Sequence, residues 1–240
     1  MRPVENQRRT CGWQSGVNPE MDPLMPAPSL PKNVTVVEHA LARVKLAHLR
    51  DKDTPPREFR RTAQELAVLL AFAATRDLGT VPEKVRTPLA ETDGARLARP
   101  IVVVPILRAG LGICDAILPF LGDAAVGHIG MRRDEATHLP TSYYFNAPTH
   151  LAEADVLVVD LMLATGHSAS DSITKLKAAG AKHIRFICFL AAPEGIAHLS
   201  AKHPDVAIFT STVDERLDER AYIVPGLGDA GDRYFGTLPS

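Results

Sequence analysis

Five continuous runs of apolar residues constrain the fold of this chain more than any other feature. They are IVVVPIL (101–107), AVGHIGM (125–131), DVLVVDLML (155–163), IRFICFL (184–190) and VAIFTST (206–212), and helical stretches or turns separate them. Strands without strict alternation of apolar and polar residues are buried on both faces, as in a parallel sheet covered by helices. We therefore expect an α/β fold whose ligands bind at the carboxyl ends of the strands.

The composition suits one such domain and excludes several classes of protein. The chain has 240 residues, of which 45% are hydrophobic and 23% charged, as in ordinary soluble globular proteins. Its formal net charge of −1 argues against nucleic acid as a partner, because nucleic-acid binders usually carry a strong basic excess. No run approaches about eighteen apolar residues, and residues 1–25 lack a signal-peptide pattern, so we expect no membrane partner. Three cysteines without a C-x-x-C pair fit free thiols in a reducing, cytoplasmic location.

The first 33 residues differ in composition from the rest. They hold six prolines and little periodic hydrophobicity, which predicts a flexible Pro-rich tail at 1–33 and one domain at 34–240. The domain should begin with a short strand at 34–39 and a helix at 40–51. Thr54 is expected to cap a longer helix that begins at Pro55. The apolar face of that helix should consist of Phe59, Ala63, Leu66, Leu70 and Ala73.

The third apolar run leads through a loop into a helix. Asp160 stands at the tip of the strand, and LMLATGHS (161–168) forms the loop. Main-chain N–H groups at a helix N-terminus, together with the positive end of the helix dipole, bind a phosphate monoester well. The small residues Thr165, Gly166 and Ser168 let the chain wrap such a group closely, and Asp160 could accept hydrogen bonds from a sugar diol. A plain capping loop uses the same residue types, so the spacing alone leaves the two interpretations about equal.

The same loop has two catalytic alternatives. A Walker A loop is excluded, because no lysine stands between Gly166 and Ser168. A nucleophile elbow would make Ser168 the nucleophile, with His198 or His203 as its base, but serine replaces the last glycine of G-x-S-x-G and no oxyanion motif precedes it. A hydrolase is therefore a minor alternative, and we expect His198 and His203 on one solvated helix surface.

A second glycine cluster, GLGDAG (226–231), follows the strand AYIV (221–224). It matches G-x-G-x-x-G by letter, but a dinucleotide fingerprint opens a helix within a βαβ unit, and the residues after Gly231 hold no such unit. What remains is a glycine-rich loop with exposed main-chain groups. Such a loop can recognise a flat base through N–H and C=O groups, and a tight C-terminal turn is the plainer alternative.

Arginines follow two of the apolar runs. Arg108 comes directly after the first run and precedes the turn AGLG (109–112), where a guanidinium can clamp a diphosphate bidentately. Arg132 and Arg133 follow the second run, and the polar segment from there to Tyr144 is expected to form a mobile lid. The nine histidines show no metal-ligand spacing such as H-E-x-x-H, so we expect no metal ligands of the protein's own.

Together these junctions resemble those of the uracil phosphoribosyltransferases. The matching motifs are VVPILRAGLG (103–112), GMRRDEATHLP (130–140), VVDLMLATGHS (158–168), AAPEGI (191–196), HPDV (203–206) and YIVPGLGDAGDRYFGT (222–237). The resemblance implies a type I phosphoribosyltransferase fold, in which helices flank a parallel sheet and a small hood lies near the base site. It also implies a pentosyltransferase of pyrimidine salvage, which converts uracil and phosphoribosyl diphosphate (PRPP) to UMP and diphosphate.

The resemblance further implies roles for individual residues. PRPP would be bound by Arg108, Arg133, Asp160, Leu161, Met162, Leu163, Ala164, Thr165, Gly166, His167, Ser168 and Asp229. Uracil would be bound by Ile223, Gly228, Asp229 and Ala230, and the catalytic residues would be Arg108, Arg133 and Asp229. The implied cofactor is Mg²⁺ in complex with PRPP. GTP as an effector and a homodimer or larger homo-oligomer are implied as well.

Two positions depart from the family pattern. His167 stands in the phosphate loop where the family usually has glycine, and a left-handed conformation there would cost about 1 kcal/mol. Arg132, Arg133 and Asp134 replace the usual Tyr-Arg-Asn, which changes the charge of the lid. These departures leave a second hypothesis open, a regulator that binds PRPP or UMP and has little catalytic activity.

Overall fold

The computed structural model describes residues 30–133 and 140–237. The chain divides into two units after Leu30, and every described helix and strand belongs to the second unit, Pro31–Ser240. The flexibility expected of residues 1–33 falls almost entirely on residues outside the described part. The same holds for residues 134–139 of the expected lid.

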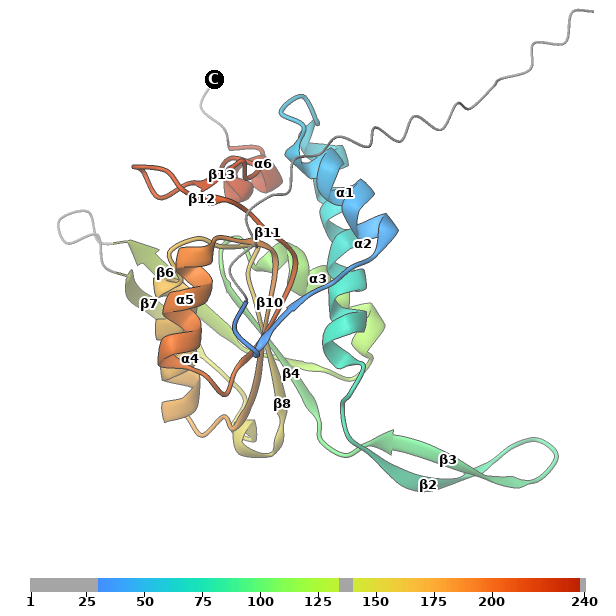
Figure 1. Ribbon diagram of the computed structural model, residues 1–240. Coiled ribbons are helices and arrows are strands. Elements are labelled where there is room, and N and C mark those ends of the chain that lie inside the picture. The colour runs from blue at the N-terminus through green and yellow to red at the C-terminus, as the bar shows by residue number, and fades with distance from the viewer. Residues whose placement is uncertain (1–29, 134–139, 238–240) are drawn as a thin grey trace, which may run out of the picture. The chain divides into compact units, whose positions relative to one another are not determined.

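Nine strands of the second unit form one sheet (Figure 1). Its order is β1 (Val34–Val36), β11 (Ala207–Val213), β10 (His183–Ala191), β8 (Asp155–Val159), β4 (Ile101–Leu107), β6 (His128–Arg133) and β7 (Pro140–Asn146), while β5 (Ala125–Val126) pairs with β4 and β9 (Met162–Leu163) with β10. All pairs are parallel except β6 with β7. The prediction of a mostly parallel sheet built from the five apolar runs is confirmed.

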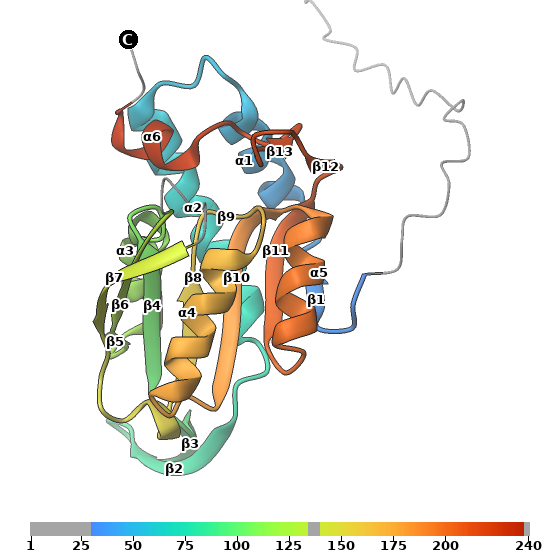
Figure 2. The ribbon, with the colours of Figure 1, turned by 90° about the vertical axis from the view of Figure 1, so that its left-hand side faces the viewer.

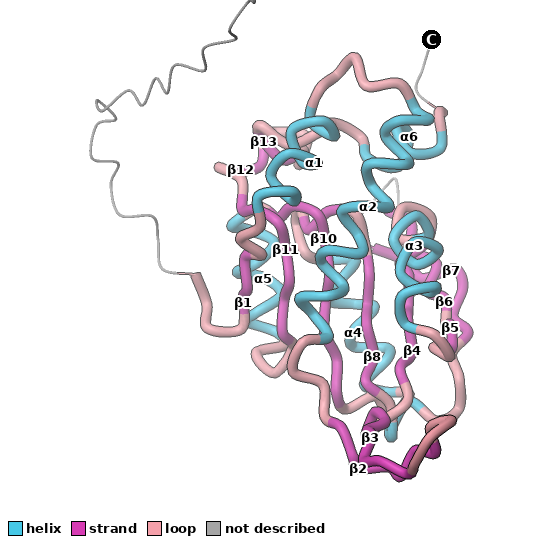
Figure 3. The backbone as a smooth tube through the Cα atoms, turned by 90° about the vertical axis from the view of Figure 1, so that its right-hand side faces the viewer, coloured by secondary structure: helices cyan, strands magenta, loops and turns pink. Residues whose placement is uncertain are grey.

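Helices cover both faces of this sheet. The helices α1 (Ala40–Arg50), α2 (Pro56–Thr75) and α3 (Leu111–Leu121) cover one face, and α4 (His167–Ala178) and α5 (Pro193–Lys202) cover the other (Figures 2 and 3). Along β4, Val103 packs into the core beneath α2 and α3, whereas Val102 and Val104 pack into the core beneath α4 and α5. Both faces of the central strands are thus buried, which explains why the runs lack alternation.

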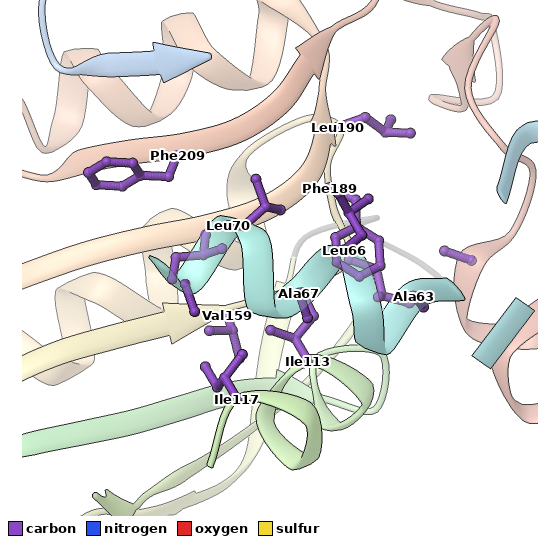
Figure 4. Packing of buried hydrophobic residues seen from close by; sticks show 14 of the residues in the cluster. Ala63, Leu66, Ala67, Leu70, Ile113, Ile117, Val159, Phe189, Leu190 and Phe209 are labelled. Carbon is purple, nitrogen blue, oxygen red and sulfur yellow. The ribbon is translucent and has the colours of Figure 1, made fainter. Parts of the chain in front are cut away.

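The apolar face of α2 packs on α3 and the sheet (Figure 4). Leu66 and Leu70 are fully buried there, and burying a leucine side chain stabilises the fold by about 1.5–3 kcal/mol. The neighbours of α2 in this cluster include Ile113, Ile117, Val159 and Phe189. The predicted face of the helix is correct except at its end, where Ala74 rather than Ala73 is fully buried.

Two sequence predictions about local structure are wrong. α2 begins at Pro56 with Pro55 as its N-cap, because the Thr54 hydroxyl donates instead to the carbonyl oxygen of His48 at 2.6 Å, which ties it to the end of α1. The part of the expected lid from Pro140 to Tyr144 belongs to β7, where backbone pairing with β6 orders it. Only residues 134–139 of that segment stay a lid prediction.

Two smaller pieces complete the unit. The antiparallel hairpin of β2 (Thr80–Arg86) and β3 (Glu91–Leu97) projects from the sheet (Figure 1). The hairpin of β12 (Arg216–Leu217) and β13 (Ile223–Val224), with α6 (Ala230–Phe235), forms a hood beyond the carboxyl ends of the strands (Figure 2). A short 3-10 helix (Leu151–Glu153) precedes β8. Across the described residues, every helix is too short or too polar to cross a membrane.

Candidate active site

The loop from β8 to α4 lies at the carboxyl edge of the sheet. Its base is fastened to β10, because Asp160 N donates to Ile187 O at 3.1 Å and Phe189 N donates to Leu161 O at 2.9 Å. Gly166 has a φ of 79°, and a Cβ there would lie 2.7 Å from the carbonyl oxygen of Gly195. Only glycine fits this position, so the close approach of α5 helps to define the loop.

The N-terminus of α4 presents free main-chain donors at the end of that loop. The first intrahelical bond is donated by Ser170 N to Gly166 O at 2.9 Å, so the N–H groups of His167, Ser168 and Ala169 precede it and have no partner within the helix. Such groups at the positive end of a helix dipole favour a phosphate. The predicted PRPP residues Leu161 and Leu163 bury their side chains in the core, so they can offer only main-chain atoms to a ligand.

Asp160 is the acid at the tip of β8. Burial raises the pKa of its carboxyl group to about 7, and the Leu161 N–H, which donates to its Oδ1 at 2.7 Å, partly opposes this shift. The carboxyl group therefore exchanges its proton close to neutral pH. In its ionised form it can accept hydrogen bonds from the hydroxyls of a sugar.

Arg108 lies beside this loop, as predicted for the end of β4. Its side chain is exposed, and the Leu107–Arg108 peptide bond is cis. A Cβ on Gly110 would lie 2.3 Å from the carbonyl oxygen of Val159, so the turn after Arg108 packs directly on the end of β8. Arg133 ends β6, which pairs with β4, and its backbone therefore lies at the same edge of the sheet.

The predicted base-binding residues are in the hood. Ile223 and Ala230 are buried, while Gly228 is exposed with a φ of 77°. Asp229 is the N-cap of α6, where its Oδ1 accepts a hydrogen bond from Asp232 N at 2.9 Å. The loop between β13 and α6 can therefore present main-chain groups to a flat base. One carboxylate oxygen of Asp229 is used for capping, and the role of Asp229 in catalysis stays a prediction.

Sequence reasoning missed the side chain that fastens the hood. Arg233 of α6 is buried and donates to Leu227 O at 2.8 Å. It also donates to the carbonyl oxygens of Leu49 and Asp51 at the end of α1, and its guanidinium lies 4.5 Å from the centre of the Phe59 ring. Arg233 lies within the family motif at 222–237, and this motif was the sequence signal that could have identified it.

A second set of missed residues is the ion pair of Arg50 with Asp214. Asp214 follows β11 directly. Its position at a strand tip is the same sequence signal that pointed to Asp160, and it could have identified Asp214 as well. The partner could not be found this way, because Arg50 is 164 residues away in the chain.

The histidines do not support a hydrolase. His203 is buried, contrary to prediction, because α4 offers it partners: its Nε2 lies 3.1 Å from Ser170 O and its Nδ1 lies 3.2 Å from Lys177 Nζ. The ring of His198 packs on that of His167, with 4.4 Å between their centroids. Within residues 30–133 and 140–237, no hydrogen bond joins Ser168 to a histidine. The nucleophile elbow thus lacks its base.

A cavity of about 570 Å³ lies between α1 and the ends of β1 and β11. Its wall includes Arg43, Arg50 and Ser211, and it includes none of the residues predicted to bind PRPP or uracil. We therefore place the candidate site at the loops after β4 and β8 and at the hood, where the chemically useful groups converge.

Comparison with known proteins gives matches over most of the chain. The family model for uracil phosphoribosyltransferase matches residues 36–237. A uracil phosphoribosyltransferase of Salinibacter ruber is 48% identical and covers 87% of this chain and 100% of its own length, and one of Clostridium tetani is 49% identical, with coverages of 85% and 98%. The structure of the AQ2163 protein of Aquifex aeolicus is 33% identical and covers 86% of this chain and 100% of its own, with a TM-score of 0.82. The chain belongs to the uracil phosphoribosyltransferase family.

Proposed function

We propose that this protein transfers the 5-phosphoribosyl group of PRPP to N1 of uracil and releases pyrophosphate. The observation that carries the proposal is the meeting of three structures at one edge of the sheet: the exposed Arg108, the free N–H groups of α4 and the glycine-rich loop of the hood. Each suits a different part of the reaction, namely diphosphate, 5′-phosphate and base. Membership of the family supports the same assignment.

The reaction needs orientation and charge stabilisation more than acid–base groups. The bond from C1 of the ribose to the diphosphate oxygen breaks, and its electron pair leaves with pyrophosphate. The N1–C1 bond forms, and the N1 proton of uracil is released to solvent. We assign Arg108 and Arg133 to the charge on the leaving group. The N–H groups of α4 and the carboxylate of Asp160 hold the sugar phosphate in position.

Magnesium fits this site as a companion of the substrate. Across the described residues, no three histidine, cysteine, aspartate or glutamate side chains are grouped to hold a metal. Mg²⁺ usually keeps several waters and binds through one or two carboxylates together with substrate phosphates, which suits delivery with PRPP. The metal would neutralise charge on the departing diphosphate, with Asp160 and Asp229 as the available carboxylates.

A homo-oligomer is supported by the β2–β3 hairpin. Its strands pair only with each other in the sheet topology, and Val85, Leu89 and Leu97 are exposed on it. An isolated two-stranded hairpin has marginal stability in water, so we propose that a second copy of the chain covers it. Light scattering measures the molar mass in solution and would show whether the protein is larger than one chain. GTP as an effector and a cytoplasmic location stay predictions without an assigned structural feature.

A direct assay tests the function. Purified protein is incubated with PRPP, Mg²⁺ and either uracil, cytosine, hypoxanthine or adenine, and the nucleotide formed is measured by chromatography. We expect UMP from uracil and little product from the other bases. A protein that binds PRPP in a titration but forms no nucleotide would instead be the regulator of the alternative hypothesis.

A further inference from the structure

The ion pair of Arg50 with Asp214 holds the loop that would bind uracil at Gly226, next to the contact that Arg233 makes at Leu227. Arg50, the last residue of α1, pairs through both terminal nitrogens with the two carboxylate oxygens of Asp214, just beyond β11, with Nη1 2.8 Å from Oδ2. Nη1 also donates to Gly226 O at 2.7 Å, and Gly226 N donates to Asp214 Oδ2 at 2.8 Å. Both main-chain groups of Gly226 are therefore held by this pair.

Gly226 lies at the centre of the proposed base-binding loop. It is three residues after Ile223 and two before Gly228, the positions assigned to uracil. The loop is tight, since a Cβ on Gly226 would lie 2.0 Å from the carbonyl oxygen of Ile223. A displacement of Gly226 must consequently move the main-chain groups on both sides of it.

We propose that Arg50 is a positioning residue for uracil, acting through Asp214 and Gly226 without touching the base. The proposal rests on the assignment of uracil to the hood loop. The uracil and PRPP parts of the site should respond separately to the loss of Arg50. The phosphate loop is held by β10 and by the close approach of α5, and the Arg50–Asp214 pair makes none of these contacts.

The burial of the pair makes its loss consequential. The side chain of Asp214 is 2% exposed and that of Arg50 is 24% exposed. Removing the guanidinium leaves a buried carboxylate without its cation, which is strongly unfavourable. The Asp214 carboxylate must then be solvated by water. This water competes with the hydrogen bond that the carboxylate accepts from Gly226 N.

The first test is Arg50→Met, which keeps an unbranched stem in place of the arginine stem and removes the charge and the donors. We expect the KM for uracil to rise about tenfold or more, while the KM for PRPP and kcat each change by less than about threefold, the pattern of an interaction lost for one substrate alone. Arg50→Lys, which restores the charge without the bidentate fork, should recover part of the uracil KM.

Arg185→Met is the matched control. Arg185 is 18% exposed, pairs with the carboxylate of Asp77 and donates to Ala74 O at 2.6 Å, but β10 begins near it and the hood is at the other end of the sheet. We expect this variant to lose some thermal stability and to keep the wild-type KM values. A rise in the uracil KM as large as that of Arg50→Met would show a general effect of instability and overturn the proposal.

Asp214→Asn tests the route through the carboxylate. It should raise the uracil KM in the same direction, and the double variant with Arg50→Met should be less impaired than the product of the two single effects. A normal uracil KM in Arg50→Met, or an equal rise in both KM values, overturns the proposal. If Arg50→Met fails to fold, the KM ratio of Arg50→Lys decides in the same way. Failure of the wild-type protein to form UMP would instead refute the proposed function.

Discussion

Replacing Asp160 by asparagine should stabilise the protein and impair it at the same time. Burial raises the pKa of this carboxyl group from 3.8 to about 7. Between these two values the unfolded chain releases a proton that the folded chain retains, so the free energy of unfolding falls as pH rises through this window. Asparagine is neutral at every pH and of nearly the same size. The variant should therefore gain stability relative to wild type as pH rises, with the difference complete above about pH 7.

The size of the gain follows from the same pKa. At about 1.36 kcal/mol per pKa unit, the difference between 3.8 and about 7 corresponds to roughly 4 kcal/mol. Entry of water beside the ionised carboxylate lowers this figure, so we expect about 1–4 kcal/mol at pH 8 and no difference near pH 4. Activity should fall in the variant, since an amide is a weaker acceptor than a carboxylate for the ribose hydroxyls. Such an opposition between stability and activity is common at functional sites.

Urea unfolding of wild type and Asp160→Asn at several pH values between 4 and 8 measures the effect. Asp205→Asn is a control of opposite sign: Lys177 donates to this carboxylate at 2.7 Å and lowers its pKa. The pair with Lys177 stabilises the fold at pH values above the pKa of Asp205 in the unfolded chain, and this stabilisation is lost as pH falls. The stabilisation is small because the Asp205 side chain is exposed. A stability difference for Asp160→Asn that does not vary with pH would refute the reasoning.

Three other variants or treatments probe the site and the core. Arg108→Ala should lower kcat/KM more than tenfold, about 1.4 kcal/mol or more of lost transition-state stabilisation, and near-normal steady-state kinetics would refute its role. His167→Gly should preserve or improve PRPP affinity, because the imidazole packs on α5; a large loss in a PRPP titration would show that it contacts the phosphate. Cys114 and Cys188 are buried with pKa values raised to about 12, so in a Cys11→Ser background a thiol reagent at pH 8 should modify neither until the protein is unfolded.

Much of the site could be predicted because its residues follow strands directly. Arg108 after β4 and Asp160 after β8 are strand-tip residues, and in a parallel sheet all such tips meet at one edge. The family resemblance added the hood loop, and membership of the family is confirmed. The individual roles assigned to these residues are still predictions, which the kinetics of the variants can test.

Errors arose where a residue's partner lies far away in the chain. The second apolar run forms two strands, β5 and β6, and both of them pair with β4. His203 is buried because α4 supplies its partners. Neither partner can be read from the local pattern of apolar residues.

The sequence by itself determined the class of fold, the order of the loops and their chemistry, since apolar periodicity and strand-tip residues are local properties. Only the tertiary structure decided how the hood is held over the site. Arg50, Asp214 and Gly226 come from three separate segments, and a buried charge finds its partner through the packing of the whole domain. No spacing in the chain encodes that choice.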